Sequence, residues 1–321
     1  MDKNFVLEIA SLIGEVINTQ LPVPVELAAI ADVLTADPGE KVWKYSATED
    51  TADVILAVDA STGEITVKQR DAVDITEISF SGLNSKLEYV LVDAVLGAAD
   101  TDLLSRRRES ITRGMDKREV KIIVDAILNK TGGALPGKEP FEVLPESPDD
   151  LYDVIVAMKH KVEDYGDGFV LLCASDVKEA IDNYDKAINA GNVGGISLPA
   201  KLKELGIEVI KMFGKVSEGA SAGAEDEVKM MEDGKMILVA KNSRLHEGKP
   251  IKFVRRRISP DIAKLMGADV DKAQRATIVN PTPVLVGGTN TLAYGIYGYE
   301  SVVFAITNPY ALCIADASTV I

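Results

Sequence analysis

A helical pattern from Asp100 to Lys130 constrains the fold of this chain more than any other segment. At about 3.6 residues per turn, five apolar residues of this stretch fall on one narrow line: Leu104, Ile111, Met115, Ile122 and Ala126. Asp100 or Thr101 can cap the first turn, and Gly132 and Gly133 supply an exit. At about 1.5 Å per residue the helix would be roughly 45 Å long. We therefore predict one long spine helix.

The two halves of this segment differ in polarity. The first half carries four arginines, at Arg106, Arg107, Arg108 and Arg113. The second half has further apolar residues on its other faces: Val120, Ile123, Val124, Ile127 and Leu128. We expect the helix to begin near solvent and to end in a core. Gly114 costs about 1 kcal/mol relative to Ala in a helix interior, and it indicates a weak point or a slight bend.

The composition is that of a globular protein with excess negative charge. The 321 residues are 46% hydrophobic and 26% charged, which allows one large or two ordinary domains. Because 50 acidic residues stand against 35 basic ones, the formal net charge is -15. Such a charge repels a phosphate backbone, so we do not expect nucleic-acid binding as the primary function.

The sequence predicts a soluble protein made in a reducing cytoplasm. No apolar run approaches the roughly 18–20 residues of a membrane helix. Glu8 and Glu15 interrupt the apolar pattern from Phe5 to Ile17, unlike the continuous run of a signal peptide. Cys173 and Cys313 both lie inside apolar runs, which favours buried free thiols over a disulfide or a metal site.

Residues 1–40 have the pattern of an N-terminal arm. Apolar residues at three- and four-residue spacing predict a short amphipathic helix within the first 17 residues: Phe5, Ile9, Leu12, Ile13 and Val16. Pro22 and Pro24 then favour an extended path. A second short helix is expected from Val25 to Leu34, before a turn at Asp37 to Gly39.

Residues 41–82 change to the period of a β-strand. Alternating apolar residues on both sides of a turn at Ala60 to Gly63 predict a hairpin: Val54, Leu56, Val58, Ile65 and Val67. A further alternating run extends from Val73 to Phe80. An isolated two-stranded hairpin is marginal in water, so it either lies on its own domain or pairs with another chain. The pattern from Asn84 to Ala98 fits a strand or a helix equally well.

The chain after the long helix has two textures. Residues 132–150 are rich in Gly and Pro and indicate a linker. An α/β pattern follows, in which helices and strands alternate. We expect a helix ending near Glu163, a strand Phe169 to Ala174, a helix to about Ala190, and strands Ile207 to Phe213 and Lys235 to Ala240.

The last third of the chain is mostly strand. We expect strands at Ile251 to Ile258, Pro283 to Val286, Ser301 to Thr307 and Ala311 to Ala315, and a short helix at Pro260 to Ala268. Turns are expected at Gly287, Gly288, Gly295 and Gly298.

Motifs for catalysis or cofactor binding are not recognised in the sequence. Residues 132–138 match the GxxxxGK part of a phosphate loop, but Glu139 replaces the magnesium-binding Ser or Thr and the segment follows a helix. We interpret His160 and His246 as solvated surface residues, and neither cysteine belongs to a CxxC pair. We therefore predict no catalytic, cofactor-binding or metal-binding residues, although missing motifs do not exclude an enzyme.

Two arginine triplets stand out in this acidic chain. Arg106, Arg107 and Arg108 lie on the long helix, and Arg255, Arg256 and Arg257 lie on a predicted strand. The arginines could form ion pairs with acidic residues of the chain, which include Glu49, Asp50, Asp71, Asp74 and Glu77. One interpretation is that the arginines are solvated or satisfied within the subunit. The sharper hypothesis is pairing between identical subunits, where guanidinium groups fix orientation.

The order of the segments, an α+β arrangement, resembles the major capsid protein of tailed bacteriophages with the Hong Kong 97-type fold. The resemblance covers nearly the whole chain and rests on architecture, because the family has no short diagnostic motif. It implies an N-terminal arm at 1–40, an extended loop (E-loop) hairpin at 41–82, a peripheral domain with the spine helix at 83–148, an axial domain at 149–240, and a return to the peripheral domain at 241–321, whose last strands can rejoin the axial domain.

The resemblance implies a structural function. Hexamers and pentamers of one chain would tile an icosahedral shell around double-stranded phage DNA, without sequence-specific binding to that DNA. It also implies location in the virion after synthesis in the host cytoplasm, a separate scaffold protein, a portal and decoration proteins, with no cofactor and no membrane. The alternatives are an encapsulin-like shell around a protein cargo, a cytoplasmic α/β enzyme with an unidentified site, and a tail or baseplate component.

Overall fold

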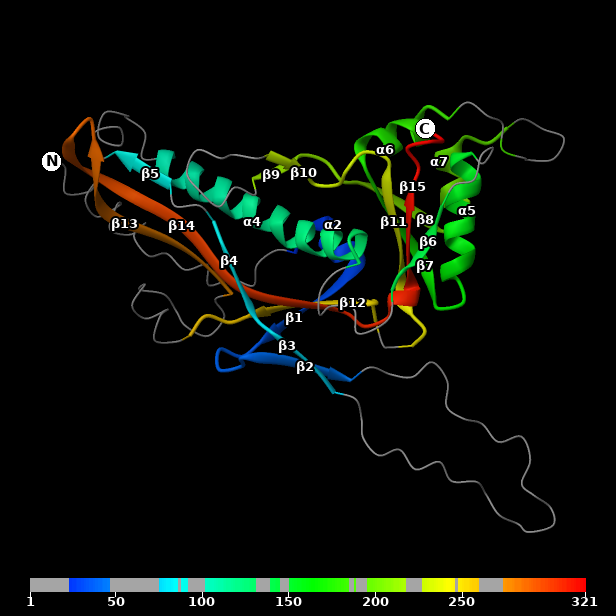
Figure 1. Ribbon diagram of the computed structural model, residues 1–321, viewed down its shortest axis with the longest axis horizontal. Helices are drawn as coiled ribbons and strands as arrows, with labels where there is room; N and C mark the ends of the chain where they lie inside the picture. The colour runs from blue at the N-terminus through cyan, green and yellow to red at the C-terminus, as the bar shows by residue number, and fades with distance from the viewer. Residues whose placement is uncertain are drawn as a thin grey trace, which may run out of the picture.

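The computed structural model describes residues 23–46, 75–85, 88–91, 102–130, 139–144, 150–184, 188, 195–217, 227–245, 248–259 and 274–321. In these residues, two larger sheets lie at different ends of the molecule, and one long helix, α4, runs from the first toward the second (Figure 1). Several predicted features fall outside the described residues: the first amphipathic helix, the hairpin from Val54 to Val67, the helix exit at Gly132 and Gly133, His246, and the short helix from Pro260 to Ala268.

Helix α4, Asp102–Leu128, confirms the predicted spine helix and has 27 residues. Its first half is polar, and the side chains of Arg106 and Arg107 are exposed. Its second half is buried, as the apolar pattern predicted, with four side chains almost free of solvent contact: Val120, Ile123, Val124 and Ile127. Helical structure continues through Gly114, where a Cβ atom would meet nothing within 4 Å.

The first sheet has the strand order β1-β12-β14-β13, with β4 and β5 also paired to β14. The bounds are β1 Ala31–Ala36, β4 Ser81–Asn84, β5 Glu88–Leu91, β12 Ile251–Arg256, β13 Arg275–Val286 and β14 Thr289–Ile306. Strand β1 runs parallel to β12, and the other pairs are antiparallel. The segment from Asn84 to Ala98 therefore contains a strand, β5, in its described part.

Strands β13 and β14 form a much longer hairpin than the sequence predicted. Its turn is Gly287 and Gly288, whose φ angles of 56° and 84° suit a hairpin turn of the I′ type. Gly295 and Gly298 were expected to be turns, and this prediction is wrong because both lie inside β14. At Gly298 the sheet approaches α4 so closely that a Cβ atom would lie 2.5 Å from Met115 Sδ.

The predicted helix from Val25 to Leu34 is only partly correct. Helix α2, Val25–Ile30, buries Leu27 and Ile30 in the core, but the chain then becomes strand β1. The register pairs Ala31 with Ile251 and Ala36 with Arg256. Tertiary pairing with β12 therefore overrides the local helical pattern over the last four residues of the predicted helix.

The second sheet is assembled from distant parts of the chain in the order β6-β15-β11-β7-β8. The bounds are β6 Phe141–Val143, β7 Gly166–Cys173, β8 Ile207–Lys211, β11 Lys235–Ser243 and β15 Leu312–Asp316. The segment 132–150, expected to be a linker, thus contributes the edge strand β6. The short 3-10 helix η1, Pro309–Ala311, precedes β15.

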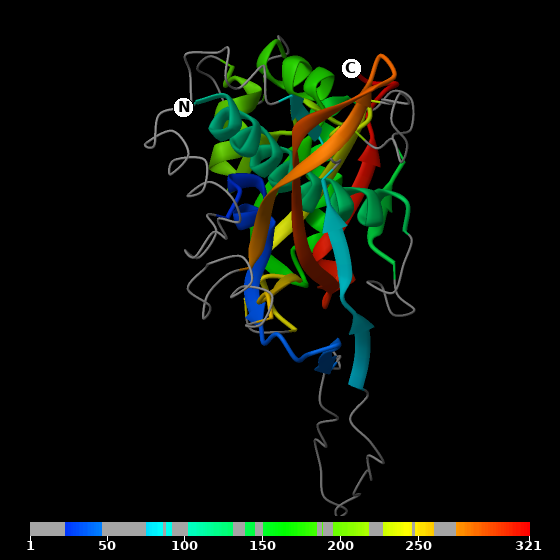
Figure 2. The same ribbon diagram turned by 90° about the vertical axis from the view of Figure 1, so that its left-hand side faces the viewer.

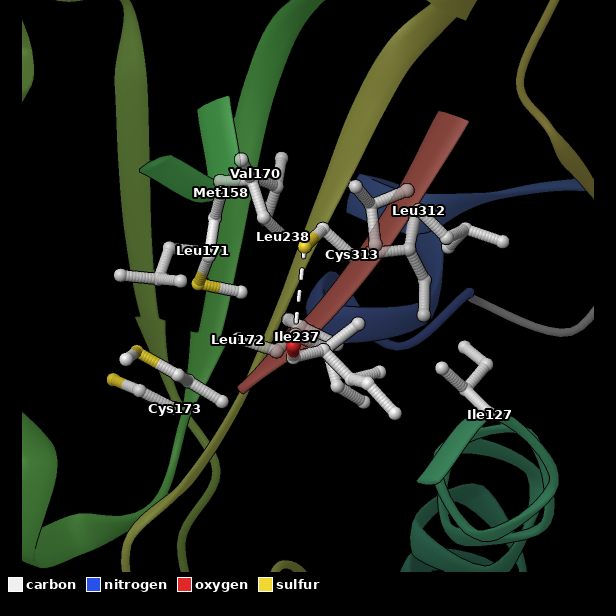
Figure 3. Close-up of a cluster of buried hydrophobic side chains, with 14 of the residues drawn as sticks. Ile127, Met158, Val170, Leu171, Leu172, Cys173, Ile237, Leu238, Leu312 and Cys313 are labelled. Atoms are coloured by element: carbon white, nitrogen blue, oxygen red, sulfur yellow. Dashed lines mark hydrogen bonds between the residues drawn. The ribbon is translucent and has the colours of Figure 1, made fainter. Parts of the chain in front are cut away.

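Helices cover both faces of this second sheet, and the main core lies there. Helix α5, Leu151–Val162, packs on one face, whereas α2 and the end of α4 lie on the other (Figure 1). Figure 3 shows Met158 of α5 and Ile127 of α4 on opposite sides of the strands. Residues 236–240 of β11 are fully buried in succession, as expected for a strand covered on both faces.

The remaining elements are short. Helix α6, Ser175–Asp182, ends well before the predicted limit at Ala190, and α7, Leu198–Glu204, packs beside β8. Strands β9, Lys215–Ser217, and β10, Glu227–Lys229, form a small hairpin. Asp150 caps α5 by accepting a hydrogen bond of 3.1 Å from the amide of Asp153.

Strands β2, Val42–Ser46, and β3, Ile75–Ser79, pair antiparallel within the region predicted to form a hairpin. Trp43, Ile78 and Phe80 pack against Val254 and Val303 of the first sheet. Figure 2 shows β3 leading directly into β4, which joins β14. The pairing of β2 with β3 is therefore anchored to the first sheet by an apolar contact.

Candidate functional site: the arginine positions and a buried ionic network

The described residues offer no metal centre or membrane helix. No group of three or more His, Cys, Asp or Glu residues in these segments could hold a metal ion. None of the described helices combines the length and apolar character needed to cross a bilayer. Cys173 and Cys313 are buried, and burial raises the pKa of each thiol to about 12. Both thiols are therefore protonated and poorly reactive at neutral pH.

Arg255 is buried and paired inside the subunit. Its Nε donates to Glu119 Oε1 at 2.7 Å, and its Nη2 donates to Glu119 Oε2 at 2.6 Å. The side chain of Arg255 is 1% exposed and that of Glu119 is 0% exposed. The predicted pairing of Arg255 with another subunit is therefore wrong, because the guanidinium group faces α4 and is inaccessible to a second copy.

Arg275 extends this pair into a network between α4 and the first sheet. Its Nε donates to Glu300 Oε2 at 2.6 Å, and its Nη1 donates to Asp116 Oδ1 at 2.7 Å. Its Nη2 lies 3.5 Å from Glu119 Oε1. Two arginines from β12 and β13 thus meet two acids of α4 and one of β14. We call Asp116, Glu119, Arg255, Arg275 and Glu300 the helix–sheet network.

Sequence reasoning missed Arg275, Glu119 and Glu300, although one signal pointed to two of them. Arg275 and Glu300 are direct partners in the ladder of β13 and β14. They lie at equal distances along the chain from the Gly287 and Gly288 turn. A long hairpin centred on this turn would have placed the two charges opposite each other. The glycines inside β14, Gly295 and Gly298, resemble turn residues and conceal this register in the sequence.

Burial governs the electrostatics of the helix–sheet network. Burial and the nearby charge of Glu119 raise the pKa of Glu300 to about 7, against the opposing influence of Arg275. Burial alone would lower the pKa of the Arg275 guanidinium. The negative charges around it have a larger, opposite effect, so this pKa is raised; they belong to Glu300, Glu119 and Asp116. Arg275 Nη2 and Glu300 Oε1 find no hydrogen-bond partner among the described residues. The network is thus tightly packed but incompletely satisfied.

The other two arginines of the second triplet contact a turn of their own chain. Arg256 Nη1 donates to the carbonyl oxygen of Glu40 at 2.9 Å, and its guanidinium lies 5.2 Å from the ring centre of Phe80. Arg257 Nη1 lies 3.4 Å from Asp37 Oδ1, with both side chains partly exposed. These contacts connect the end of β12 to the turn after β1.

The first triplet lies on the outer part of α4. Arg106 and Arg107 are exposed, and Arg108 is partly buried. Among the acidic residues proposed to answer the triplets, Glu77 pairs with Lys44 across β2 and β3 at 2.5 Å. The other four lie outside the described residues: Glu49, Asp50, Asp71 and Asp74. Contacts of Arg106, Arg107 and Arg108 with another subunit remain a prediction.

Among the comparisons with known proteins, only the comparison with solved structures gives matches, and these matches show the fold. No protein-family model and no curated protein sequence matches the chain. Among solved structures, the capsid of the native GTA particle is 13% identical, with a TM-score of 0.56 over 94% of this chain and 93% of that one.

Two further matches are bacteriophage proteins. The mature capsid of bacteriophage PhiM1 is 9% identical, with a TM-score of 0.52 over 94% of this chain and 90% of that chain. A structure of Mycobacterium phage Che8 is 10% identical, with a TM-score of 0.50 over 88% and 86% of the two chains. The chain has the Hong Kong 97-type capsid fold that its segment order predicted.

Proposed function

We propose that this chain is a major capsid protein of a tailed bacteriophage, which self-assembles as pentamers and hexamers into an icosahedral shell around double-stranded DNA. The observation that carries the proposal is the match of nearly the whole chain, 94%, to capsid subunits of two different particles. Because the match covers nearly the whole chain, it extends beyond a local resemblance. In this proposal the chain has a structural function and no catalytic one.

The arrangement of the subunit supports this function. Helix α4 is bound to the first sheet through Asp116 and Glu119, and its last turns are buried in the core that covers the second sheet, so one helix connects the two sheets. In the proposed shell, residues 149–240 surround the rotational axes, and residues 83–148 with 241–321 extend outward from them. Residues 1–40 and 41–82 then reach neighbouring subunits as an arm and an E-loop.

The charge of the chain supports an enclosing role toward DNA. At a net charge of -15, the subunit repels phosphate groups. It would therefore enclose the DNA without sequence-specific binding to it. Assembly would require a separate scaffold protein and a portal, and decoration proteins can bind the finished shell. The chain would be made in the host cytoplasm and reside in the virion.

The test is size-exclusion chromatography of the purified chain followed by negative-stain electron microscopy. Closed shells, tubes or ring-shaped capsomers support the proposal, whereas a uniform monomer or dimer that stays small with scaffold protein or a crowding agent contradicts it. The contents of particles purified from the native source separate two kinds of shell. DNA inside indicates a phage capsid, and a protein cargo without DNA indicates an encapsulin-like compartment.

A further inference from the structure

The helix–sheet network has more acidic than basic groups. Asp116, Glu119 and Glu300 supply three carboxyl groups, whereas Arg255 and Arg275 supply two guanidinium groups. Four of these five side chains are at most 1% exposed. If every group were ionised, the network would therefore carry one excess negative charge in the interior. Such a charge is costly, and a buried carboxyl group usually avoids it by holding a proton.

The hydrogen bonds indicate which carboxyl group holds this proton. Both oxygens of Glu119 accept from Arg255. Asp116 accepts from Arg275 and is 27% exposed, so its charge is partly solvated. Glu300 differs from both, because only its Oε2 accepts from Arg275, and its buried Oε1 has no partner among the described residues. A proton on Glu300 Oε1 therefore displaces no hydrogen bond of the network.

The same face of the sheet holds a further polar atom that lacks a partner. Arg275 is the direct partner of Glu300, and Thr277 follows Arg275 by two residues along β13, so the three side chains share the face that meets α4. Thr277 is 1% exposed, and its Oγ1 has no hydrogen-bond partner in the described part of the chain. A hydrogen atom on Glu300 supplies a donor to this cluster, directly or through a bound water molecule.

The charged groups around Glu300 come from three elements. Burial, together with the charge of Glu119 on α4, raises the pKa of Glu300 to about 7, whereas Arg275 of β13 and Arg255 of β12 oppose this rise. Asp116 of α4 joins them through Arg275. Strand β4, which pairs with β14 beside Glu300, has no charged residue. The proton of Glu300 is therefore exchanged in the range between pH 6 and pH 8.

We propose that Glu300 holds one exchangeable proton at the junction of α4 and the first sheet, and that loss of this proton loosens the junction. When the proton passes to solvent water, three carboxylates share two guanidinium groups, which favours movement of α4 away from the sheet and access of water to Glu300. Because α4 connects the first sheet to the core of the second (Figure 1), the proton determines how firmly the two are joined. This switch belongs to the folded subunit and goes beyond the proposed shell function.

Infrared difference spectroscopy of the unassembled chain detects the proton directly, because a protonated carboxyl group has a C=O stretching band distinct from that of a carboxylate. The band should be present at pH 6 and about tenfold weaker at pH 8. It should be absent from Glu300→Gln and unchanged in Glu77→Gln, the matched variant of an exposed carboxylate. A spectrum of the unmodified chain without this band at pH 6, or the same band in Glu300→Gln, overturns the proposal.

Hydrogen exchange measures the loosening. For the amides of residues 111–119 of α4, the opening equilibrium constant, corrected for the intrinsic pH dependence of exchange, should rise about tenfold from pH 6 to pH 8. In Glu300→Gln, whose side chain is uncharged at every pH, this rise should be absent, and Glu77→Gln should retain it. Exchange that is independent of pH in the unmodified chain, or a rise of the same size in Glu300→Gln, contradicts the proposal.

The design covers failure of the variant and a different neutralising group. If Glu300→Gln does not fold, the infrared spectra of the unmodified chain at the two pH values decide. If a bound sodium ion balances the excess charge instead, the carboxyl band is missing at pH 6 and replacement of sodium by choline at constant ionic strength increases the opening, which overturns the assignment of a proton. None of these measurements uses assembled particles, so this proposal and the proposed function succeed or fail independently.

Discussion

Arg255 of β12 and Glu119 of α4 form a two-pronged ion pair, with nitrogen to oxygen distances of 2.7 and 2.6 Å, in a part of the subunit closed to solvent. The pair fixes the long helix to the first sheet at one register. Because both groups are fully desolvated, loss of either partner leaves an uncompensated charge in the interior.

Replacing Glu119 should therefore destabilise the subunit strongly. We expect Glu119→Gln to lower the free energy of unfolding by about 3–5 kcal/mol, since Arg255 would keep its charge without its partner. Urea denaturation of the unassembled chain, followed by circular dichroism, measures the effect.

Glu77→Gln is the matched control, because it removes the same charge from an exposed pair with Lys44. That substitution should cost about 1 kcal/mol or less. Equal losses from Glu77→Gln and Glu119→Gln would contradict the structural importance of the buried pair.

Stability should depend on pH through Glu300. Its pKa is about 7 in the folded protein and about 4.5 as the ordinary value, so the folded state holds more protons between these values. The contribution of Glu300 is thus fully present below pH 4.5 and is lost as the pH rises through 7. Going from pH 8 to pH 5 should stabilise the unmodified chain by on the order of 2 kcal/mol relative to Glu300→Gln.

Urea denaturation of the unmodified chain and of Glu300→Gln at several pH values provides the measurement. Two other carboxyl groups with shifted pKa values do not titrate in this range. The pKa of Glu163 is lowered to about 2 by hydrogen bonds from His160 and Lys159, and that of Asp316 is lowered to about 2 by hydrogen bonds from Lys235 and Ser318. Their stabilising contributions are lost only as the pH falls from about 4 toward 2. Parallel pH profiles for the unmodified chain and Glu300→Gln would contradict the assignment.

The close approach of β14 to α4 predicts a steric effect at Gly298. In Gly298→Ala the added Cβ would lie 2.5 Å from Met115 Sδ and 2.9 Å from Ile111 Cγ2. We expect destabilisation by about 1–3 kcal/mol, as for other overpacked cores. Thermal denaturation measures it.

Gly114→Ala on α4 is the matched control, because no atom lies within 4 Å of the added Cβ. In a helix interior this change should stabilise the chain by up to about 1 kcal/mol. Destabilisation by Gly114→Ala, or tolerance of Gly298→Ala, would contradict the described packing.

Hydrophobic periodicity was sufficient to predict the long helix and the central strands of the second sheet. In the second half of α4, Ile123 and Ile127 are buried, as the helical pattern predicted. The apolar residues of β11 are also buried, as expected for an apolar strand. The β13 and β14 hairpin was missed because Gly298 resembles a turn residue locally. Its small size instead serves the contact with Met115, which comes from a distant part of the chain.

The helix–sheet network was beyond prediction from local patterns for a related reason. A charged residue such as Arg255 usually indicates a solvated surface, so its neighbours in sequence suggested a basic patch. Its burial depends on a carboxylate 136 positions away, at Glu119. Helix α2 likewise ended early because Ala31 pairs with Ile251, a partner that no local pattern identifies.

The first arginine triplet remains a candidate for contacts between subunits. Replacing Arg106, Arg107 and Arg108 by Ser should suppress assembly. The chain should still fold, because two of these side chains are exposed and the third is only partly buried. Sedimentation measures the assembled fraction, and circular dichroism verifies folding.

A control should remove three exposed positive charges elsewhere. Replacing Lys203, Lys211 and Lys229 by Ser makes the same change in net charge on other elements. Normal shells from the arginine variant, or equal loss of assembly in both variants, would show that the triplet has no specific role.

A cryo-electron microscopy reconstruction of particles assembled from the purified chain tests the central claim most directly. The account predicts an icosahedral shell of five- and six-membered rings built from copies of this chain. A chain that yields only monomers or dimers, even with scaffold protein present, would contradict a capsid function for this fold.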